Sequence, residues 1–403
     1  MAVSVYEALQ SIDKHLSPVS VELVPIENAT GKIAAEKIFA KVALPPFDNS
    51  AMDGYALKGQ YTSYRIIGKI LAGDTHTYTL RDGECIKILT GAKVPESCDT
   101  VIPQENVSVQ DDETIIIEKP VQTGANLRYC GEDVAFGELL LQPGEKITSA
   151  HIGLLASQGI THTKVFRQIE AAVFASGSEL KLHFEQIEDA QIYNSNTPYL
   201  LARLSELGCN THFLGKSEDS LEALKRLIGN TQNYDLIVTS GGVSVGEADF
   251  TKQAFEELGM EIFFSKVQIK PGKPTTFGKI GNTLILNLPG NPLAGALNFE
   301  LFGTFLIRKL SGQKAYHHRY IETTITEPLK SPRLVANMIP GFYDGKTFTP
   351  AKKYSPGMVN TLSHCNGFIV LSPETESLGK GEPVKFLPIR WEFSQEEQGS
   401  FMS

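Results

Sequence analysis

Cysteine is scarce and unpaired in this sequence. The 403 residues include 5 cysteines, an odd number at wide spacing, and no Cys-x-x-Cys pair occurs. This pattern argues against a disulfide framework or a zinc ribbon, and it favours reduced thiols in a cytoplasmic protein. The 9 histidines form no metal-ligand pattern either.

Long hydrophobic runs and an excess of basic residues are also lacking. No apolar stretch approaches the roughly 20 residues that span a bilayer, and the first residues do not have the order of a secretion signal. The 37 Lys and Arg residues are outnumbered by 46 Asp and Glu, which gives a net charge of −9. Such a chain repels nucleic-acid phosphates. We therefore predict a cytoplasmic protein with no membrane and no nucleic-acid partner, whereas a small anion needs only a few local cations and amides.

Length and composition predict several globular domains. One hydrophobic core rarely grows beyond about 250–300 residues, and 41% hydrophobic with 21% charged residues is close to the globular average. The apolar spacing predicts a helix over residues 5–16, a strand over 21–26 and a second helix that begins at Asn28 or Thr30. Short β-prone runs between turns then predict a small inserted β domain over residues 46–134.

Strands and helices alternate over residues 166–313. This is the pattern of an α/β domain with a mostly parallel sheet flanked by helices. One helix is expected over residues 199–207, with Thr197 as its N-cap, and a long helix should begin at Pro292 and end near Gly312.

Short strands return after the α/β region and predict a C-terminal β domain. The predicted domain limits are 1–45 with 135–165 for a discontinuous N-terminal domain, 46–134 for the inserted β domain, 166–313 for the α/β domain and 314–403 for the C-terminal β domain.

Four loops of the α/β region follow predicted strands, over residues 176–180, 239–249, 270–274 and 288–292. Ligands of parallel α/β sheets bind outside the carboxyl ends of the strands. The second loop is rich in glycine and hydroxyl groups and leads into a helix, an arrangement that suits an oxyanion. It has neither a Walker nor a dinucleotide-binding pattern, which argues against an ATPase or a dehydrogenase. An ordinary tight turn is the alternative.

Charged side chains accompany these loops. Lys270 and Lys273 flank a rigid Pro-Gly turn, and two cations so placed suit a phosphate or an oxyanion. Glu179, Glu247 and Asp249 come from two loops that could converge. Such carboxylates hold Mg²⁺ beside a phosphate, or they serve as partners of helix N-termini, and spacing alone leaves both interpretations open.

The inserted domain carries turns rich in acidic and hydroxyl groups, over residues 46–56, 90–95 and 128–133. Taken by themselves, these turns are compatible with a purely structural role.

Taken together, the segments resemble one family, the molybdopterin molybdenumtransferases, or MoeA family, which includes the gephyrin E domain. The resemblance spans nearly the full length and depends on seven segments in the same order. These are residues 45–56, 90–95, 131–133, 176–180, 239–249, 270–274 and 288–292.

The resemblance implies four domains, with a MogA-like α/β domain and a C-terminal domain like a β-barrel, in an elongated homodimer. It implies an active site shared between the α/β domain of one subunit and the first two domains of the other. The implied reaction is the Mg²⁺-dependent insertion of molybdate into adenylylated molybdopterin, which releases AMP and gives molybdenum cofactor. Other proteins of molybdenum cofactor biosynthesis are compatible partners.

The resemblance also implies roles for individual residues. The expected catalytic residues are Asp53, Thr90, Asp133, Glu179 and Asp249. Of these, Glu179, Asp249 and Asp53 would hold the metal.

Substrate binding is expected from the glycine loop, the lysine loop, the loop before the long helix and one arginine of the last domain. The residues are Ser240, Gly241, Gly242, Ser244, Gly246, Lys270, Lys273, Pro289, Gly290, Asn291 and Arg333.

The sequence departs from the family pattern at several oxyanion-binding positions. Ser178 stands where an Asp or Asn is usual, and Ala294 and Pro356 stand where the family has hydroxyl groups. Of two usual arginines, only Arg333 is present. These losses motivate an alternative, a non-catalytic paralogue that acts as a scaffold for molybdopterin or a partner. A nucleotide-pyrophosphate hydrolase is a third hypothesis.

Overall fold

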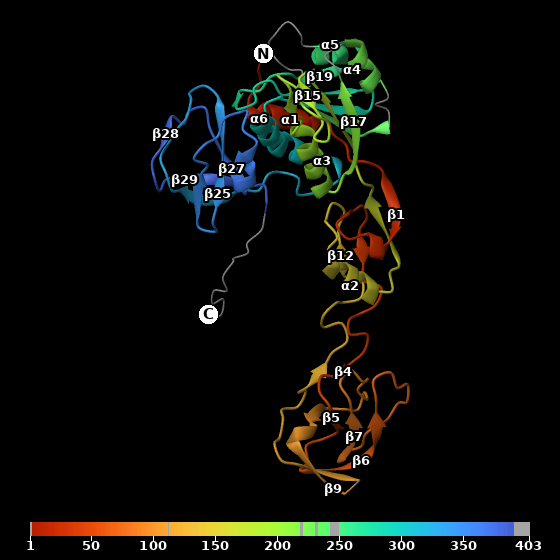
Figure 1. The fold of residues 1–403 in the computed structure, drawn as a ribbon. Helices are drawn as coiled ribbons and strands as arrows, with labels where there is room; N and C mark the ends of the chain where they lie inside the picture. Colours follow the sequence, from red (N-terminus) through yellow and green to blue (C-terminus); the bar gives the residue numbers. More distant parts are fainter. Residues whose placement is uncertain (1, 112, 218–220, 230–232, 242–249, 391–403) are drawn as a thin grey trace. The chain divides into compact units, whose positions relative to one another are not determined.

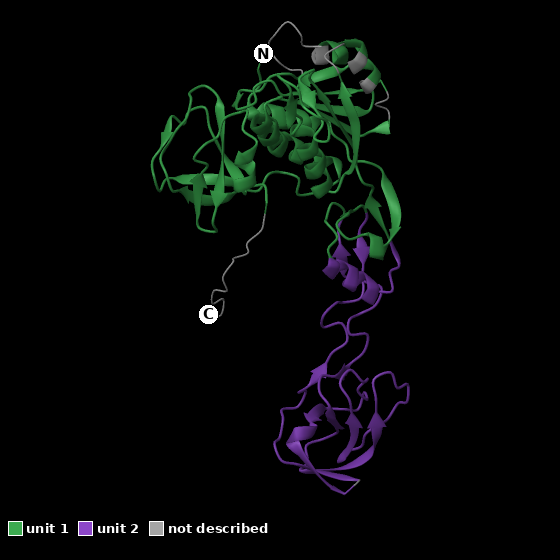
Figure 2. Ribbon diagram, in the orientation of Figure 1, with its two compact units in different colours: residues 1–35, 143–148, 163–403 green, residues 36–142, 149–162 purple. Residues whose placement is uncertain are grey.

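The computed structural model describes residues 2–111, 113–217, 221–229, 233–241 and 250–390. The chain divides into two compact units (Figure 2), and each is described by itself. Unit 1 comprises residues 1–35, 143–148 and 163–403, and unit 2 comprises residues 36–142 and 149–162. The four domain limits expected from the sequence stay a prediction.

A six-stranded sheet forms the centre of the α/β region in unit 1 (Figure 1). In spatial order its strands are β17 (Asn210–Ser217), β14 (Glu170–Ser176), β18 (Leu236–Ser240), β22 (Thr283–Leu288), β21 (Thr276–Ile280) and β19 (Glu261–Phe264). The first four are parallel to one another, and β21 runs antiparallel to β22. The predicted mostly parallel sheet is therefore confirmed.

Helices cover both faces of this sheet (Figure 1). One face packs against α4 (Leu221–Ile228) and α5 (Phe250–Glu257). The other packs against α1 (Val5–Lys14), α3 (Asn196–Glu206), α6 (Pro292–Asn298) and α7 (Thr304–Leu310).

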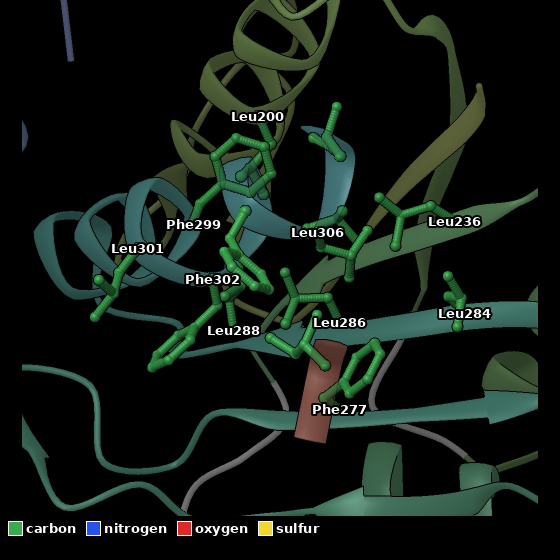
Figure 3. Close-up of a cluster of buried hydrophobic side chains, with 14 of the residues drawn as sticks. Leu200, Leu236, Phe277, Leu284, Leu286, Leu288, Phe299, Leu301, Phe302 and Leu306 are labelled. Carbon is green, nitrogen blue, oxygen red and sulfur yellow. The ribbon is translucent and has the colours of Figure 1, made fainter. Parts of the chain in front are cut away.

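Strand β22 belongs to both cores because successive side chains of a strand point to opposite faces. Leu286 and Leu288 are fully buried with Phe302 and Leu306 of the helical segment above them (Figure 3). Ile285 is buried on the opposite face, with the cluster beneath α5. Burying side chains of this size stabilises a fold by about 1.5–3 kcal/mol each, so the strand ends that carry the loops are held rigidly.

The predicted long helix after Pro292 is present but contains a π-helical turn, Phe299–Gly303, between α6 and α7. Glu300 lies in this turn and is buried. Its carboxylate accepts hydrogen bonds from Arg203 Nε at 2.7 Å and from Tyr199 Oη at 2.9 Å. Arg203 Nη2 also donates to the carbonyl oxygen of Ile389 at 3.1 Å. The buried ion pair thus connects α3, the helical segment and the C-terminal domain.

The C-terminal domain is a closed five-stranded barrel. Its strands are β25 (Ala336–Tyr343), β26 (Thr347–Pro350), β23 (Ile321–Ile325), β29 (Pro383–Pro388) and β27 (Gly367–Leu371), and β27 closes the barrel by pairing with β25. A short strand, β20 (Ile269–Lys270), pairs with β25 and links the barrel to the α/β region. This confirms the expected barrel-like domain.

Unit 2 contains a second six-stranded sheet, which confirms the inserted β domain. In spatial order its strands are β8 (Thr100–Pro103), β5 (Gly54–Leu57), β7 (Glu84–Ile88), β6 (Ser63–Ile70), β10 (Thr114–Ile117) and β9 (Val107–Asp111). The unit also holds the helix α2 (Ser149–Ser157) and two short strand pairs. The first is β4 (Asn49–Ser50) with β11 (Leu127–Arg128), and the second is β3 (Ile38–Phe39) with β12 (Leu139–Leu141).

The prediction of a second helix that begins at Asn28 or Thr30 was wrong. A single 3₁₀ turn, Ile26–Asn28, follows β1 (Val21–Pro25), and Gly31 then takes a positive φ of 82°. The next residues form β2 (Ile33–Ala34), which pairs with β13 (His162–Phe166). Pairing with a segment distant in sequence overrides the local helical pattern.

All five cysteines lie within the described residues and are free. Burial raises the pKa of Cys85 and of Cys209 to about 12, so neither thiol is a ready nucleophile. In the described part of the chain, no helix is both long and apolar enough to pass through a membrane.

Candidate functional site

A pocket of about 1130 Å³ opens at the carboxyl ends of β14, β18 and β22. Because these strands are parallel, the loops that follow them meet at one edge of the sheet. The pocket lining includes seven residues of the predicted site: Glu179, Ser240, Gly241, Lys273, Pro289, Gly290 and Asn291.

The backbones of three loops approach closely at the floor of the pocket. Gly241 has a φ of 104°, and a Cβ there would lie 2.7 Å from the carbonyl oxygen of Ser176. A Cβ on Gly290 would lie 3.3 Å from the Cα of Gly241. The amide of Gly241 donates to the carbonyl oxygen of Leu288 at 3.2 Å. Gly241 is therefore needed for the close approach and does not offer its amide to a ligand.

Free amides are provided by the next loop instead. The backbone N–H groups of Gly290 and Asn291 donate to no group among the described residues, and both residues are exposed and line the pocket. Adjacent free amides at a strand-to-helix turn form a concave site for an anion. The predicted residues Gly242, Ser244, Gly246 and Asp249 lie outside the described residues, as does Glu247.

Asn196 holds two of these loops together. Its Nδ2 donates to Ser240 Oγ and to the carbonyl oxygen of Gly290, both at 2.7 Å. In the sequence, the segment around Asn196 indicates only the start of a helix, so no local pattern marks this residue as part of the site. The helix begins at Asn196, and the side chain of Asn194 accepts from the backbone N–H of Thr197 at 3.1 Å. The prediction that Thr197 is the N-cap was therefore wrong.

The two predicted lysines have different surroundings. Lys273 is exposed, lines the pocket and forms no ion pair with any described residue. Lys270 belongs to the strand β20, where its backbone lies opposite Asn337 of the barrel strand β25. It is not among the residues that line the pocket. Lys266 also lines the pocket, and no motif in the sequence pointed to it. The pocket is therefore electropositive on the side of Lys273.

Glu179 is the only acidic residue among the described lining residues. Its carboxylate folds back over the loop, since a Cβ on Gly177 would lie 2.8 Å from Oε2 of Glu179. Within the described ranges, no three His, Cys, Asp or Glu side chains are grouped closely enough to hold a metal ion. Glu179 lines the same pocket as Gly290 and Asn291, and a carboxylate is the kind of ligand that Mg²⁺ takes together with substrate oxygens.

Two further predicted acids, Asp53 and Asp133, belong to unit 2. Oδ1 of Asp53 accepts from the backbone N–H of Thr90 at 2.8 Å and from its Oγ1 at 2.7 Å. The hydrogen bond from the backbone N–H of Thr90 lowers the pKa of Asp53 most, and the bond from its hydroxyl group lowers it further. The exposed carboxylate therefore stays ionised. Asp133 is exposed, and its N–H donates to the carbonyl oxygen of Leu44 at 2.9 Å. The structure thus brings Asp53 and Thr90 together within unit 2.

Three family models match consecutive parts of the chain. The MoeA N-terminal region (domain I and II) matches residues 3–159, the probable molybdopterin-binding domain matches 172–309, and the MoeA C-terminal region (domain IV) matches 323–389. The chain belongs to the MoeA family. A molybdopterin molybdenumtransferase from Haemophilus influenzae is 35% identical over 382 residues, 92% of this chain and 94% of that protein.

Two further likenesses cover nearly the whole chain. A molybdopterin molybdenumtransferase from Staphylococcus epidermidis is 30% identical over 95% of this chain and 94% of that protein. The crystal structure of the molybdopterin biosynthesis MoeA protein from Pyrococcus horikosii superposes with a TM-score of 0.84 and 31% identity, over 97% of this chain and 100% of that one.

Two positions that depart from the MoeA family pattern, Ala294 and Pro356, contact each other through the backbone. The carbonyl oxygen of Pro356 accepts from the backbone N–H groups of Leu293 at 2.9 Å and of Ala294 at 3.3 Å. The first turn of α6 is therefore capped by the barrel segment. Arg333 is exposed, forms an ion pair with Glu376 at 2.5 Å and does not line the pocket.

Proposed function

We propose that this member of the MoeA family is a molybdopterin molybdenumtransferase. In this reaction it inserts molybdate into adenylylated molybdopterin, releases AMP and forms molybdenum cofactor. The supporting observation is the pocket at the strand ends, which is lined by Gly290, Asn291 and Lys273; among the described residues, the two backbone amides and the ammonium group have no partner. The full-length likeness to proteins that carry this transferase name gives independent support.

Each wall of the pocket has a role in this proposal. The amides of Gly290 and Asn291 bind pyrophosphate oxygens, because backbone N–H groups need no reorganisation as charge develops. Asn196 holds Ser240 and Gly290 in register for that contact. Lys273 attracts molybdate, since an ammonium group on a short rigid loop acts as a point charge for an oxyanion.

The acidic residues complete the proposed site. Glu179, with Asp249 and Asp53, would hold Mg²⁺, which supplies a Lewis acid for the phosphoryl oxygens. We infer that the chain acts as a homodimer in which the segment of Asp53, Thr90 and Asp133 completes the pocket of the second copy. The ionised state of Asp53 supports its use beside a metal.

A non-catalytic scaffold is not favoured. Its motivation was the loss of hydroxyl groups at Ala294 and Pro356. However, the bond between the N–H group of Ala294 and the carbonyl group of Pro356 is made by the backbone and needs neither hydroxyl group. The amides of Gly290 and Asn291 and the side chain of Lys273 do not depend on those hydroxyl groups either.

The test is an assay of the purified protein with adenylylated molybdopterin, Mg²⁺ and molybdate. We expect equal amounts of AMP and molybdenum cofactor. Absence of both products would contradict the proposed activity. Release of AMP from a pterin-free dinucleotide, independent of molybdate, would identify a pyrophosphate hydrolase instead.

The shared site is tested by mixing two variants that each lose a proposed metal ligand, Asp53→Ala and Glu179→Ala, and are therefore expected to be inactive. Random exchange of subunits makes half of the dimers mixed, and each mixed dimer regains one of two sites, so about a quarter of the wild-type activity should return. Recovery of no activity, with exchange verified by tagged subunits, would contradict a site shared between copies.

A further inference from the structure

Asn298 is a fully buried amide at the end of α6, and the other buried residues of that helix have no polar side chain. Its Nδ2 donates to the carbonyl oxygens of Pro271 at 3.0 Å and of Ala294 at 2.7 Å. Its Oδ1 lies 3.1 Å from Thr275 Oγ1. Both donor protons of the amide and its acceptor are thus used, and two of the three partners belong to the lysine loop or directly follow it.

The lysine loop, residues 270–274, packs closely against the side-chain amide of Asn298. Gly272 has a φ of 105°, and a Cβ there would lie 1.8 Å from Nδ2 of Asn298. Thr275 is also fully buried. Its hydroxyl group lies 2.9 Å from the carbonyl oxygen of Gly272 and 3.1 Å from Asn298 Oδ1, so its single proton is shared between these two acceptors. On the far side of the loop, the carbonyl oxygen of Lys273 accepts from Val267 N at 2.9 Å.

The helix that carries Asn298 starts from the other wall of the pocket. Asn291 is the N-cap of α6, and its free amide belongs to the anion-binding turn. Asn298 lies at the opposite end of the same seven-residue helix. A short helix is a rigid spacer, so the Asn298 contact fixes the lysine loop relative to the free amides.

We propose that Asn298 is a positioning residue that sets the place of the Lys273 ammonium group opposite the amides of Gly290 and Asn291. The inference depends on the proposed function, because it assigns Lys273 to molybdate. Asn298 does not line the pocket, so it acts through the loop. A buried polar group must be hydrogen-bonded to be tolerated, and here each bond is made within α6 or to the loop, rather than to the sheet.

The test compares Asn298→Ala with a matched control, Thr304→Val. Thr304 is buried in the same helical segment, and its Oγ1 donates to the carbonyl oxygen of Glu300 at 2.6 Å, which belongs to that segment and not to the lysine loop. Both variants lose a buried side-chain hydrogen bond and should lower Tm. Asn298→Ala should also raise the molybdate KM and the molybdate Kd from calorimetry roughly tenfold, because misplacing a positioned group by about 1 Å can cost up to about 100-fold.

A double variant separates positioning from general stability. If Asn298 acts through Lys273, then Lys273→Ala with Asn298→Ala should have the same molybdate KM as Lys273→Ala alone. The KM for the pterin should change by less than about twofold. Additive effects on the molybdate KM, or equal changes in both KM values, would overturn the inference. So would a molybdate KM that rises as much in Thr304→Val.

A further variant keeps the test decisive if Asn298→Ala does not fold. Asn298→Thr retains one donor and should give a smaller rise in the molybdate Kd; an unchanged Kd in a folded Asn298→Thr would overturn the inference. A wild-type protein that binds molybdate but releases no AMP would refute the proposed function alone, since the Kd series still decides the role of Asn298. A wild-type protein that does not bind molybdate would refute both.

Discussion

Asn196 offers a direct test of how the pocket is held together. Its Nδ2 makes two hydrogen bonds of 2.7 Å, one to Ser240 Oγ and one to the carbonyl oxygen of Gly290. The replacement Asn196→Ala removes both bonds and adds no new group. The loops after β18 and β22 then lose their direct side-chain connection at the mouth of the pocket.

The size of the effect follows from these contacts. A neutral hydrogen bond contributes about 0.5–1.5 kcal/mol net. Water can replace the amide at Gly290, which is exposed, and Ser240 keeps the carbonyl oxygen of Pro289 as its acceptor at 3.2 Å. The cost should therefore be about 1–2 kcal/mol, or a factor of roughly 5–30. We expect the KM for adenylylated molybdopterin to rise by about this factor, while the molybdate KM changes less.

The isosteric variant Asn196→Asp should be more harmful. It keeps the shape, but it places lone pairs against the carbonyl oxygen of Gly290 and a negative charge beside an anionic substrate. Two like charges about 5 Å apart at an effective dielectric constant of about 20 repel by about 3 kcal/mol, which adds roughly a hundredfold. The loss should be smaller at high ionic strength because salt screens the repulsion.

The assay is steady-state AMP release with each substrate varied in turn, together with thermal unfolding. Asn210→Ala is the matched control, because that amide donates to Glu170 on the opposite edge of the sheet. A pterin KM that is unchanged in both Asn196 variants, or that rises equally in Asn210→Ala, would refute the reasoning.

Lys273→Ala should raise the molybdate KM more than it lowers AMP release at saturating molybdate, and an unchanged molybdate dependence would refute its assignment. Thr90→Val removes the hydroxyl bond to Asp53 but keeps the backbone bond, so the pKa of Asp53 should rise. A carboxylate with a lowered pKa loses its contribution as pH falls through that pKa, so the acid limb of the pH–rate profile should move to higher pH; an unmoved limb would argue against a role for Asp53. Glu300→Ala leaves Arg203 buried without its main partner, and unfolding should show a loss of about 3–5 kcal/mol.

The Glu300 prediction has an internal control. Arg203 also pairs with Glu206 at 2.8 Å, and the side chain of Glu206 is 54% exposed. An exposed pair is worth at most about 1 kcal/mol, so Glu206→Ala should have little effect. A loss in Glu206→Ala as large as in Glu300→Ala would contradict the assignment of the stabilising contact.

The alternation of strands and helices was readable because it depends on local spacing. The helix expected over 199–207 is present as α3, Asn196–Glu206, with ends within a few residues of the expected positions. Strands β17 and β21 have weaker signals in the sequence, because one is an edge strand with polar residues and the other contains a glycine. A strand is stabilised by its pairing with a neighbouring strand, and that neighbour is often remote in sequence. The same reason explains why the helix expected after Asn28 is instead a strand.

The sequence by itself determined the family and the loops that could bind an anion. Glycine, proline and lysine at fixed spacing after a strand describe a turn and its charge locally, so Ser240, Gly290 and Lys273 could be named without coordinates. Only the tertiary structure decided which of these groups are free for a ligand. It shows the amide of Gly241 engaged by Leu288, and it shows Lys273 but not Lys270 lining the pocket.

The tertiary structure also revealed the residues that support the site. Asn196 reaches partners 44 and 94 positions away, and Asn298 reaches Pro271 across 27 positions. A local pattern records the propensity of a residue for helix or turn, and it carries no information on which remote backbone its side chain will meet. That choice is made by the packing of α3 and α6 against the sheet, because the packed core fixes where each helix begins and which way its side chains point.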